Sequence, residues 1–154
     1  MNNYDTKLKD IHLKDLIFVI LYGGVISILL GVALGLVDFY IRKYTSLSFS
    51  MIFFFIAAQY IGRTVRKQYE IPHIVYIVIT AIFLALQGLI ILLIPSIYNL
   101  AINYSDLSIL YNLRIYGIGL IQIFKSLFTG FNLWLYLEIL ILIVGTYVGT
   151  KETY

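Results

Sequence analysis

Glu138 is the residue of this chain best suited to carry chemistry inside a membrane. It lies in the stretch 131–149, which holds no other charged residue. A carboxylate at the centre of a membrane-spanning helix costs on the order of 2.5 kcal/mol or more, so it needs a cationic partner, a proton or a water-filled path. The sequence therefore predicts a proton or cation site at Glu138, or a contact with a charged helix of another protein.

Two residues are candidate partners for this carboxylate. Gln87 lies eight residues before Pro95, and Glu138 lies seven residues after Phe131. If Pro95 and Phe131 mark one membrane surface, a rise of 1.5 Å per residue predicts that both side chains lie about 11–12 Å deep. The Gln87 amide could then donate to the carboxylate, and Arg114 is the alternative partner if its helix dips inward. In a competing structural interpretation, Glu138 is a paired or protonated carboxylate that fixes the helix register.

The remaining polar candidates stand at the ends of apolar stretches. Arg63, Arg66 and Lys67 directly follow one such stretch. They could bind anionic lipid headgroups, but the simpler interpretation is a basic cluster that only fixes orientation. Glu70 and His73 precede the next stretch, and a metal or acid–base role would need further ligands nearby in the sequence.

Several classes of site find no support in the sequence. The chain has no cysteine, which excludes disulfides, thiolate catalysis and cysteine metal ligands. We find no glycine-rich phosphate loop, nucleophile elbow, HExxH motif or paired carboxylates at catalytic spacing. The net charge is +3, but the basic residues flank apolar runs and form no stripe for nucleic acid. We therefore expect no metal, no cofactor and no nucleic-acid partner.

The composition predicts an all-α integral membrane bundle that forms a single domain over residues 1–154. Apolar residues make up 61% of the chain and charged residues 12%, against about 25% charged residues in soluble domains. About 20 apolar residues cross the hydrocarbon core. Four stretches are charge-free apart from Glu138, and we expect them to be membrane spans: 16–37, 44–62, 74–95 and 131–149.

Basic residues predict the orientation of these four spans. Seven Lys and Arg residues fall on the side of the termini and four fall on the other side. Because cytoplasmic flanks carry the excess of Lys and Arg, we expect both termini, including the segment 1–15, to be cytoplasmic. The residue usage suggests a bacterial protein of the plasma membrane, with the lipid bilayer as its first partner.

The segment 105–129 has the pattern of an amphipathic helix. It could lie flat on the outer surface, enter and leave the membrane on one side, or form a fifth span that reverses the last helix. Only ten uncharged residues separate Arg114 from Lys125, which favours a surface or partly inserted helix. The stripe that defines one face, mostly polar or glycine, comprises Ser105, Ser108, Asn112, Ile115, Gly119, Gln122, Ser126 and Thr129.

Small residues at regular spacing predict where helices approach closely. The first span carries four of them, one every four residues, and two other spans carry similar edges. We expect the first seam to pack against another helix of this chain, with a second copy or a partner membrane protein as the alternative. The predicted packing residues are Gly23, Ser27, Gly31 and Gly35, then Ala81, Ala85 and Gly88, and finally Gly145 and Gly149, which share a helix face with Glu138.

Residues 59–67 read QYIGRTVRK, directly after a glycine-spaced first span. This block resembles small uncharacterised bacterial membrane proteins in which a second helix ends in Ile-Gly followed by a basic run. The resemblance covers the first three spans and implies about four spans, with no activity attached. It ends after Lys67, where Gln68 to His73 replace the glycine-rich basic loop of those proteins.

Three function classes follow from these features. The first is a non-enzymatic membrane subunit or accessory protein that docks to itself or to a partner through the first span and the amphipathic helix. The second is a small oligomeric transporter coupled to protons or cations through Glu138. The third is a membrane-embedded lipid-modifying enzyme that uses Glu138, Glu70 or His73, and it ranks last because these residues are expected at different depths.

Overall fold

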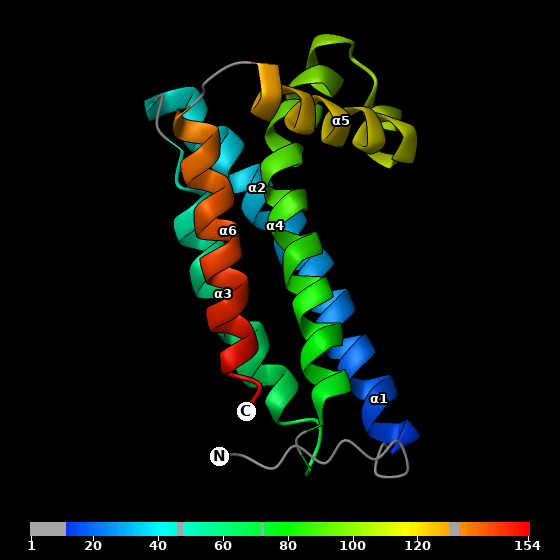
Figure 1. The fold of residues 1–154 in the computed structure, drawn as a ribbon. Helices are drawn as coiled ribbons and strands as arrows, with labels where there is room; N and C mark the ends of the chain where they lie inside the picture. Colours follow the sequence, from blue (N-terminus) through cyan, green and yellow to red (C-terminus); the bar gives the residue numbers. More distant parts are fainter. Residues whose placement is uncertain (1–11, 46–47, 72, 130–132) are drawn as a thin grey trace.

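A computed structural model describes residues 12–45, 48–71, 73–129 and 133–154. Within these residues the chain is all-helical and contains no strand. Long helices stand side by side, and one further helix, α5, crosses one end of them (Figure 1). We call this end of the bundle the α5 end, and the end where α1 begins and α6 finishes the far end.

The first long helix is a continuous rod in three parts. It comprises α1 (Leu13–Val19), the π-helical turn η2 (Ile20–Val25) and α2 (Ile26–Thr45). The predicted span 16–37 lies inside it, and the helix runs further at both ends. The predicted cytoplasmic segment 1–15 falls mostly on residues 1–11, which lie outside the described residues.

Three more helices complete the bundle: α3 (Ser50–Arg66), α4 (Ile74–Asn103) and α6 (Leu133–Lys151). The predicted span 74–95 lies inside α4, which continues through Pro95 for two further turns. Proline is tolerated in membrane helices, since neighbouring helices and local adjustments compensate for the missing backbone donor.

The predicted continuous helix 105–129 is also wrong, because the chain breaks it into two pieces. Ser105 adopts a left-handed backbone with φ of 53°, and the 3-10 turn η3 (Leu107–Tyr111) follows. Asn112 is extended, and its side chain accepts a hydrogen bond of 3.1 Å from the Arg114 N–H at the start of α5 (Leu113–Thr129). Short Asn side chains cap helices in this way, so the polar stripe contains a helix start.

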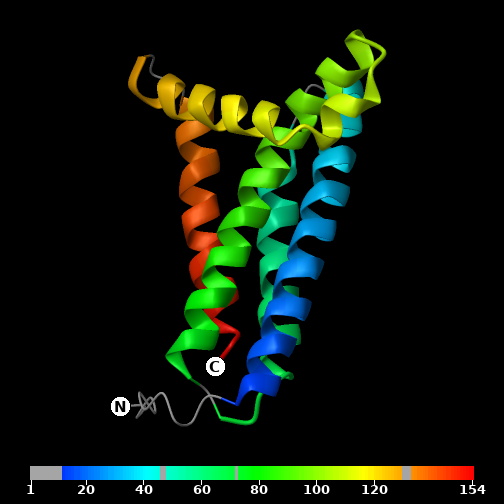
Figure 2. The same ribbon diagram turned by 90° about the vertical axis from the view of Figure 1, so that its right-hand side faces the viewer.

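Three described helices are long and apolar enough to cross a membrane: Leu13–Thr45, Ile74–Asn103 and Leu133–Lys151. Helix α3 is shorter, with 17 residues, and stands beside them in the bundle. Figure 2 shows α5 lying across the bundle axis and not along it. The described structure is therefore that of a membrane-embedded helical protein with a crosswise helix at one end.

The long helices form two pairs in which both members run in the same direction. In the first pair, α2 packs along α4 through the glycines predicted for the first span. A β-carbon at Gly31 would lie 3.1 Å from the Ile90 side chain, and one at Gly35 would lie 2.7 Å from Ile94. This seam is filled by a helix of the same chain, so it leaves no room for docking a partner there.

The second pair, α3 and α6, is packed even more closely. A β-carbon at Gly62 would lie 2.1 Å from the Gly149 carbonyl oxygen, and one at Gly149 would lie 2.8 Å from the Ala58 carbonyl oxygen. Small residues allow such backbone contacts between membrane helices. On α4, Gly88 is buried against Leu142 of α6, while the neighbouring Ala81 and Ala85 are half-buried.

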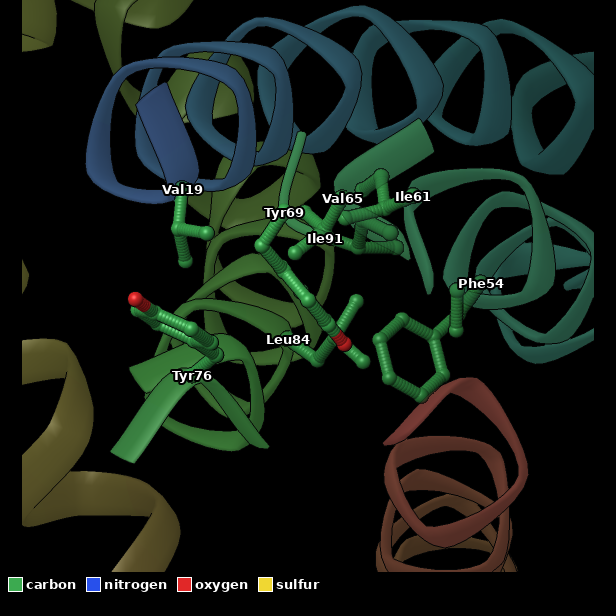
Figure 3. Close-up of a cluster of buried hydrophobic side chains, with 9 residues drawn as sticks. Val19, Phe54, Ile61, Val65, Tyr69, Tyr76, Leu84 and Ile91 are labelled. Atoms are coloured by element: carbon green, nitrogen blue, oxygen red, sulfur yellow. The ribbon is translucent and has the colours of Figure 1, made fainter. Parts of the chain in front are cut away.

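Large side chains fill the space between the two pairs. Figure 3 shows a cluster of buried side chains that includes Val19 of α1, Phe54 of α3, and Leu84 and Ile91 of α4. Toward the far end, the rings of Tyr69 and Tyr76 stack with their centroids 4.7 Å apart. This core fixes the long helices relative to one another and so positions the polar groups at the α5 end.

Candidate functional site

Asp38 is a fully buried carboxylate in the last part of α2. Its Oδ1 accepts a 2.8 Å hydrogen bond from the Phe49 N–H, and both carboxylate oxygens lie 3.3 Å from the Ser48 hydroxyl. Phe49 directly precedes α3, whose N-terminus carries a partial positive charge that favours a nearby anion. Asp38 therefore ties the end of α2 to the start of α3.

Arg42, one helical turn after Asp38, connects this carboxylate to α6. Its Nε donates to Asp38 Oδ2 at 2.5 Å, and its Nη2 donates to the Ser48 hydroxyl at 2.7 Å. The same Nη2 lies 3.4 Å from Oε1 of Glu138. We call Asp38, Arg42 and Glu138 the carboxylate–arginine cluster.

Glu138 is nearly buried, with 9% of the residue exposed. Among the described residues, Arg42 is its ion-pair partner. The predicted pairing with the Gln87 amide is wrong, because both polar atoms of that side chain lack a partner among the described residues. Arg114 stands exposed at the start of α5 and makes no described contact with Glu138.

The course of α4 explains why the predicted depths fail. The prediction measured depth from Pro95, but α4 continues to Asn103. Gly88, next to Gln87, packs against Leu142 of α6. Glu138 lies four residues before Leu142, so it stands about 6 Å, or one helical turn, nearer the α5 end than Gln87 does.

The cluster holds two carboxylates and one cation. Asp38 and Glu138 are both buried, whereas the Arg42 side chain is 37% exposed. Charges removed from water need partners, because an unpaired buried charge costs several kcal/mol. One carboxylate is left in excess, which a proton or a bound cation would neutralise.

An open cavity adjoins the cluster between the α5 ends of α2 and α4. Its volume is about 550 Å³, and its polar lining consists of Arg42, Lys43, Ser96, Asn99 and Asn103. Arg42 therefore belongs both to the cluster and to the cavity wall. A second cavity of about 460 Å³ lies under η3 and α5, but its lining is almost wholly apolar and holds no charged group.

Further polar atoms are buried between the helices. Ser27 and Gln87 are fully buried, and their side-chain polar atoms have no partner among the described residues. Gly24 and Gly31 flank Ser27 on α2. Gly24 packs against Phe83, and Gly31 packs against the Gln87 carbonyl oxygen, so Ser27 and Gln87 lie at similar height in the bundle. An unsatisfied buried polar group costs about 1–3 kcal/mol.

The predicted basic cluster at the far end has partners within the chain. Arg63 Nε lies 2.9 Å from Oε2 of Glu152, and Arg66 donates to the Tyr154 carbonyl at 2.8 Å. The hydrogen bond from Arg63 lowers the pKa of the partly exposed Glu152 carboxyl below its usual range. Lys67 is exposed, so two of the three basic residues fasten the end of α3 to the end of α6.

His73 and Glu70 also lie at the far end. His73 is buried at the start of α4, where its Nδ1 accepts a 3.2 Å hydrogen bond from the Val75 N–H. Its ring therefore caps the helix. Among residues 12–45, 48–71, 73–129 and 133–154, no group of three or more His, Cys, Asp or Glu residues could hold a metal ion.

The sequence did not reveal the contact between Arg42 and Glu138. The spacing of Asp38 and Arg42, four residues apart in one helix, was a signal for their ion pair. Nothing local predicted that the same guanidinium reaches Glu138.

Comparisons with protein families, curated proteins and solved structures found no match to this chain.

Proposed function

We propose that the chain is a four-span protein of the bacterial plasma membrane, with α3 as its fourth span. Its 17 residues cover about 26 Å at 1.5 Å per residue, close to the hydrocarbon thickness of about 30 Å. Both termini are then cytoplasmic, because seven basic residues fall on the side of the termini in this topology and four on the other side. Helix α5 lies on the outer surface as an amphipathic helix.

Within this topology we propose a transport function coupled to a proton or cation, with Glu138 as the coupling residue. The observation that carries the proposal is that one arginine is shared by two buried carboxylates. The excess carboxylate can bind and release a cation, and Arg42 can remain with either partner while it does so. Four spans are few for a complete carrier, so the active form is an oligomer.

Single-cysteine labelling tests this proposal, since the chain has no native cysteine. We expect a cysteine at position 138 to react with an impermeant thiol reagent added outside, because a coupling residue needs a wet path. Cysteines at 112 and 122 should label from outside, and one at 152 only from inside. Protection of position 138, with the other three behaving as expected, would contradict the transport function.

A non-enzymatic accessory or subunit function is the second candidate. The supporting observation is the exposed apolar side of α5, where Ile121, Phe124 and Phe128 are 67%, 60% and 88% exposed. This surface, and not the filled glycine seam of α2, would contact a partner membrane protein or a second copy. Solubilised protein that stays monomeric and co-purifies with nothing would count against this function.

A lipid-modifying enzyme has the least support. Its candidate residues are divided between the two ends of the bundle, with Glu138 near the α5 end and His73 at the far end, where α4 begins. Groups so far apart cannot act on one reacting bond.

A further inference from the structure

The open cavity between α2 and α4 has a lining suited to an anion. Arg42 and Lys43 supply two positive charges, and Ser96, Asn99 and Asn103 supply neutral hydrogen-bond donors. No Asp or Glu is among the described residues that line it. Guanidinium and ammonium groups combined with neutral donors are the usual ligands of phosphate oxygens.

Arg42 has donors to spare for such a ligand. Its hydrogen bonds to described residues use Nε and Nη2, which leaves Nη1 unused by them. Its contact with Glu138 is the longest of the three, at 3.4 Å, against 2.7–2.9 Å for a typical charge-assisted bond. An anion bound in the cavity would pull the guanidinium toward itself. The contact with Glu138, the longest of the three, would then break first, and the bond to Asp38 would stay in place.

We propose that this cavity binds a phosphate group, carried by an anionic phospholipid or present as free phosphate, and that the bound anion draws Arg42 away from Glu138. The cavity lies beside the last turns of α4, at the level where the proposed topology has lipid headgroups. The proposal has two halves: the binding of the anion and its effect on Glu138. The second half rests on the proposed function.

Two binding assays on the full chain test the first half. One titrates inorganic phosphate into protein in a neutral detergent by calorimetry. The other counts phosphatidylglycerol retained from mixed phosphatidylcholine nanodiscs by native mass spectrometry. We expect Lys43→Gln to weaken binding in one assay about fivefold, the effect of one basic residue near an anionic headgroup.

Two further variants make the assays specific. Lys125→Gln removes an exposed cation of α5 that does not line the cavity, so it should leave binding unchanged. Asn99→Leu keeps every charge and should still weaken binding. Loss in the phosphate assay assigns a free anion, and loss only in the lipid assay assigns a headgroup. No binding in either assay, or equal losses in Lys43→Gln and Lys125→Gln, would overturn the proposal.

The effect on Glu138 is tested separately. Glu138→Gln removes the competing carboxylate, so anion binding should tighten about fivefold, the lower end of usual coupling between sites. Unchanged affinity in Glu138→Gln would overturn this coupling even where Lys43→Gln still weakens binding. External labelling of a cysteine at position 138 reports the proposed function itself, so the two failures are distinguishable.

Discussion

Arg42 and Glu138 meet at the α5 end although 96 residues separate them in the sequence, with Nη2 of the arginine 3.4 Å from Oε1 of the glutamate. The contact joins α2 to α6, which belong to different helix pairs. Because Arg42 also holds Asp38 and Ser48, one guanidinium links α2, α6 and the start of α3. The cluster is therefore a structural joint as well as the candidate site.

Replacing Arg42 by Gln should destabilise the bundle by about 2 kcal/mol. The change leaves Asp38 and Glu138 as unpaired buried carboxylates, and breaking a fully buried pair costs about 3–5 kcal/mol. The expected value is lower because the Arg42 side chain is 37% exposed and so partly screened by solvent. Unfolding in a graded series of sodium dodecyl sulfate would measure it.

Lys43→Gln is the matched control for this measurement, because Lys43 is an exposed neighbour without an ion pair among the described residues. It should change the free energy of unfolding by less than about 0.5 kcal/mol. Arg42→Lys should recover only part of the loss, since an ammonium group lacks the planar fork that bridges two carboxylates. Equal stability of Arg42→Gln and Lys43→Gln would show that the cluster contributes little.

Gly62→Ala should be among the most disruptive small changes in the chain. The new methyl group would lie 2.1 Å from the Gly149 carbonyl oxygen, and backbone atoms cannot move aside as a flexible side chain can. Overpacking of this kind costs about 1–3 kcal/mol. Gly117→Ala on α5 is the control, since nothing lies within 4 Å of its added carbon, and it should gain up to about 1 kcal/mol from helix propensity.

Charge-free length and residue spacing predicted much of the fold. The described part of the last predicted span, 133–149, lies inside α6, which continues to Lys151. The every-fourth glycines of the first span do meet another helix closely. These features are local, because length, apolarity and small size are properties of the residues themselves.

The parts that failed depend on tertiary contacts. Pro95 signals a helix end in isolation, but packing carries α4 on to Asn103. That one error placed Gln87 level with Glu138 and suggested the wrong partner. The partner that the structure shows is Arg42, near the end of α2. Residue spacing within one helix cannot predict which residue of another helix lies beside it.

Acid should weaken the joint between α3 and α6 at the far end. The hydrogen bond from Arg63 lowers the pKa of Glu152 below its ordinary value of 4.5. A lowered pKa in the folded state means that this stabilisation is complete above the unfolded value and is lost as the pH falls through the folded value. Unfolding measured between pH 6 and about pH 3 should therefore show a loss of stability below about pH 4.5.

Glu152→Gln and Arg63→Gln are the variants that assign this acid loss. Either change removes the ion pair between Arg63 and Glu152. In both variants the free energy of unfolding should therefore depend less on pH, because the contribution of Glu152 is gone. A wild-type slope retained in Glu152→Gln would mean that another carboxylate is responsible. Asp106, whose pKa is lowered by hydrogen bonds from Ser108, is the next candidate.

Gln87→Met should stabilise the bundle by about 1 kcal/mol if the buried amide has no partner. Both polar atoms of Gln87 are unsatisfied among the described residues, and removing such a group while keeping its length relieves a cost of about 1–3 kcal/mol. Gln122→Met, at an exposed position of α5, is the control and should change little. A loss of stability in Gln87→Met alone would mean that the amide is hydrogen-bonded to buried water, as polar sites between helices often are. Such water would lie about one helical turn inward of Glu138 and would extend a wet path from the carboxylate–arginine cluster.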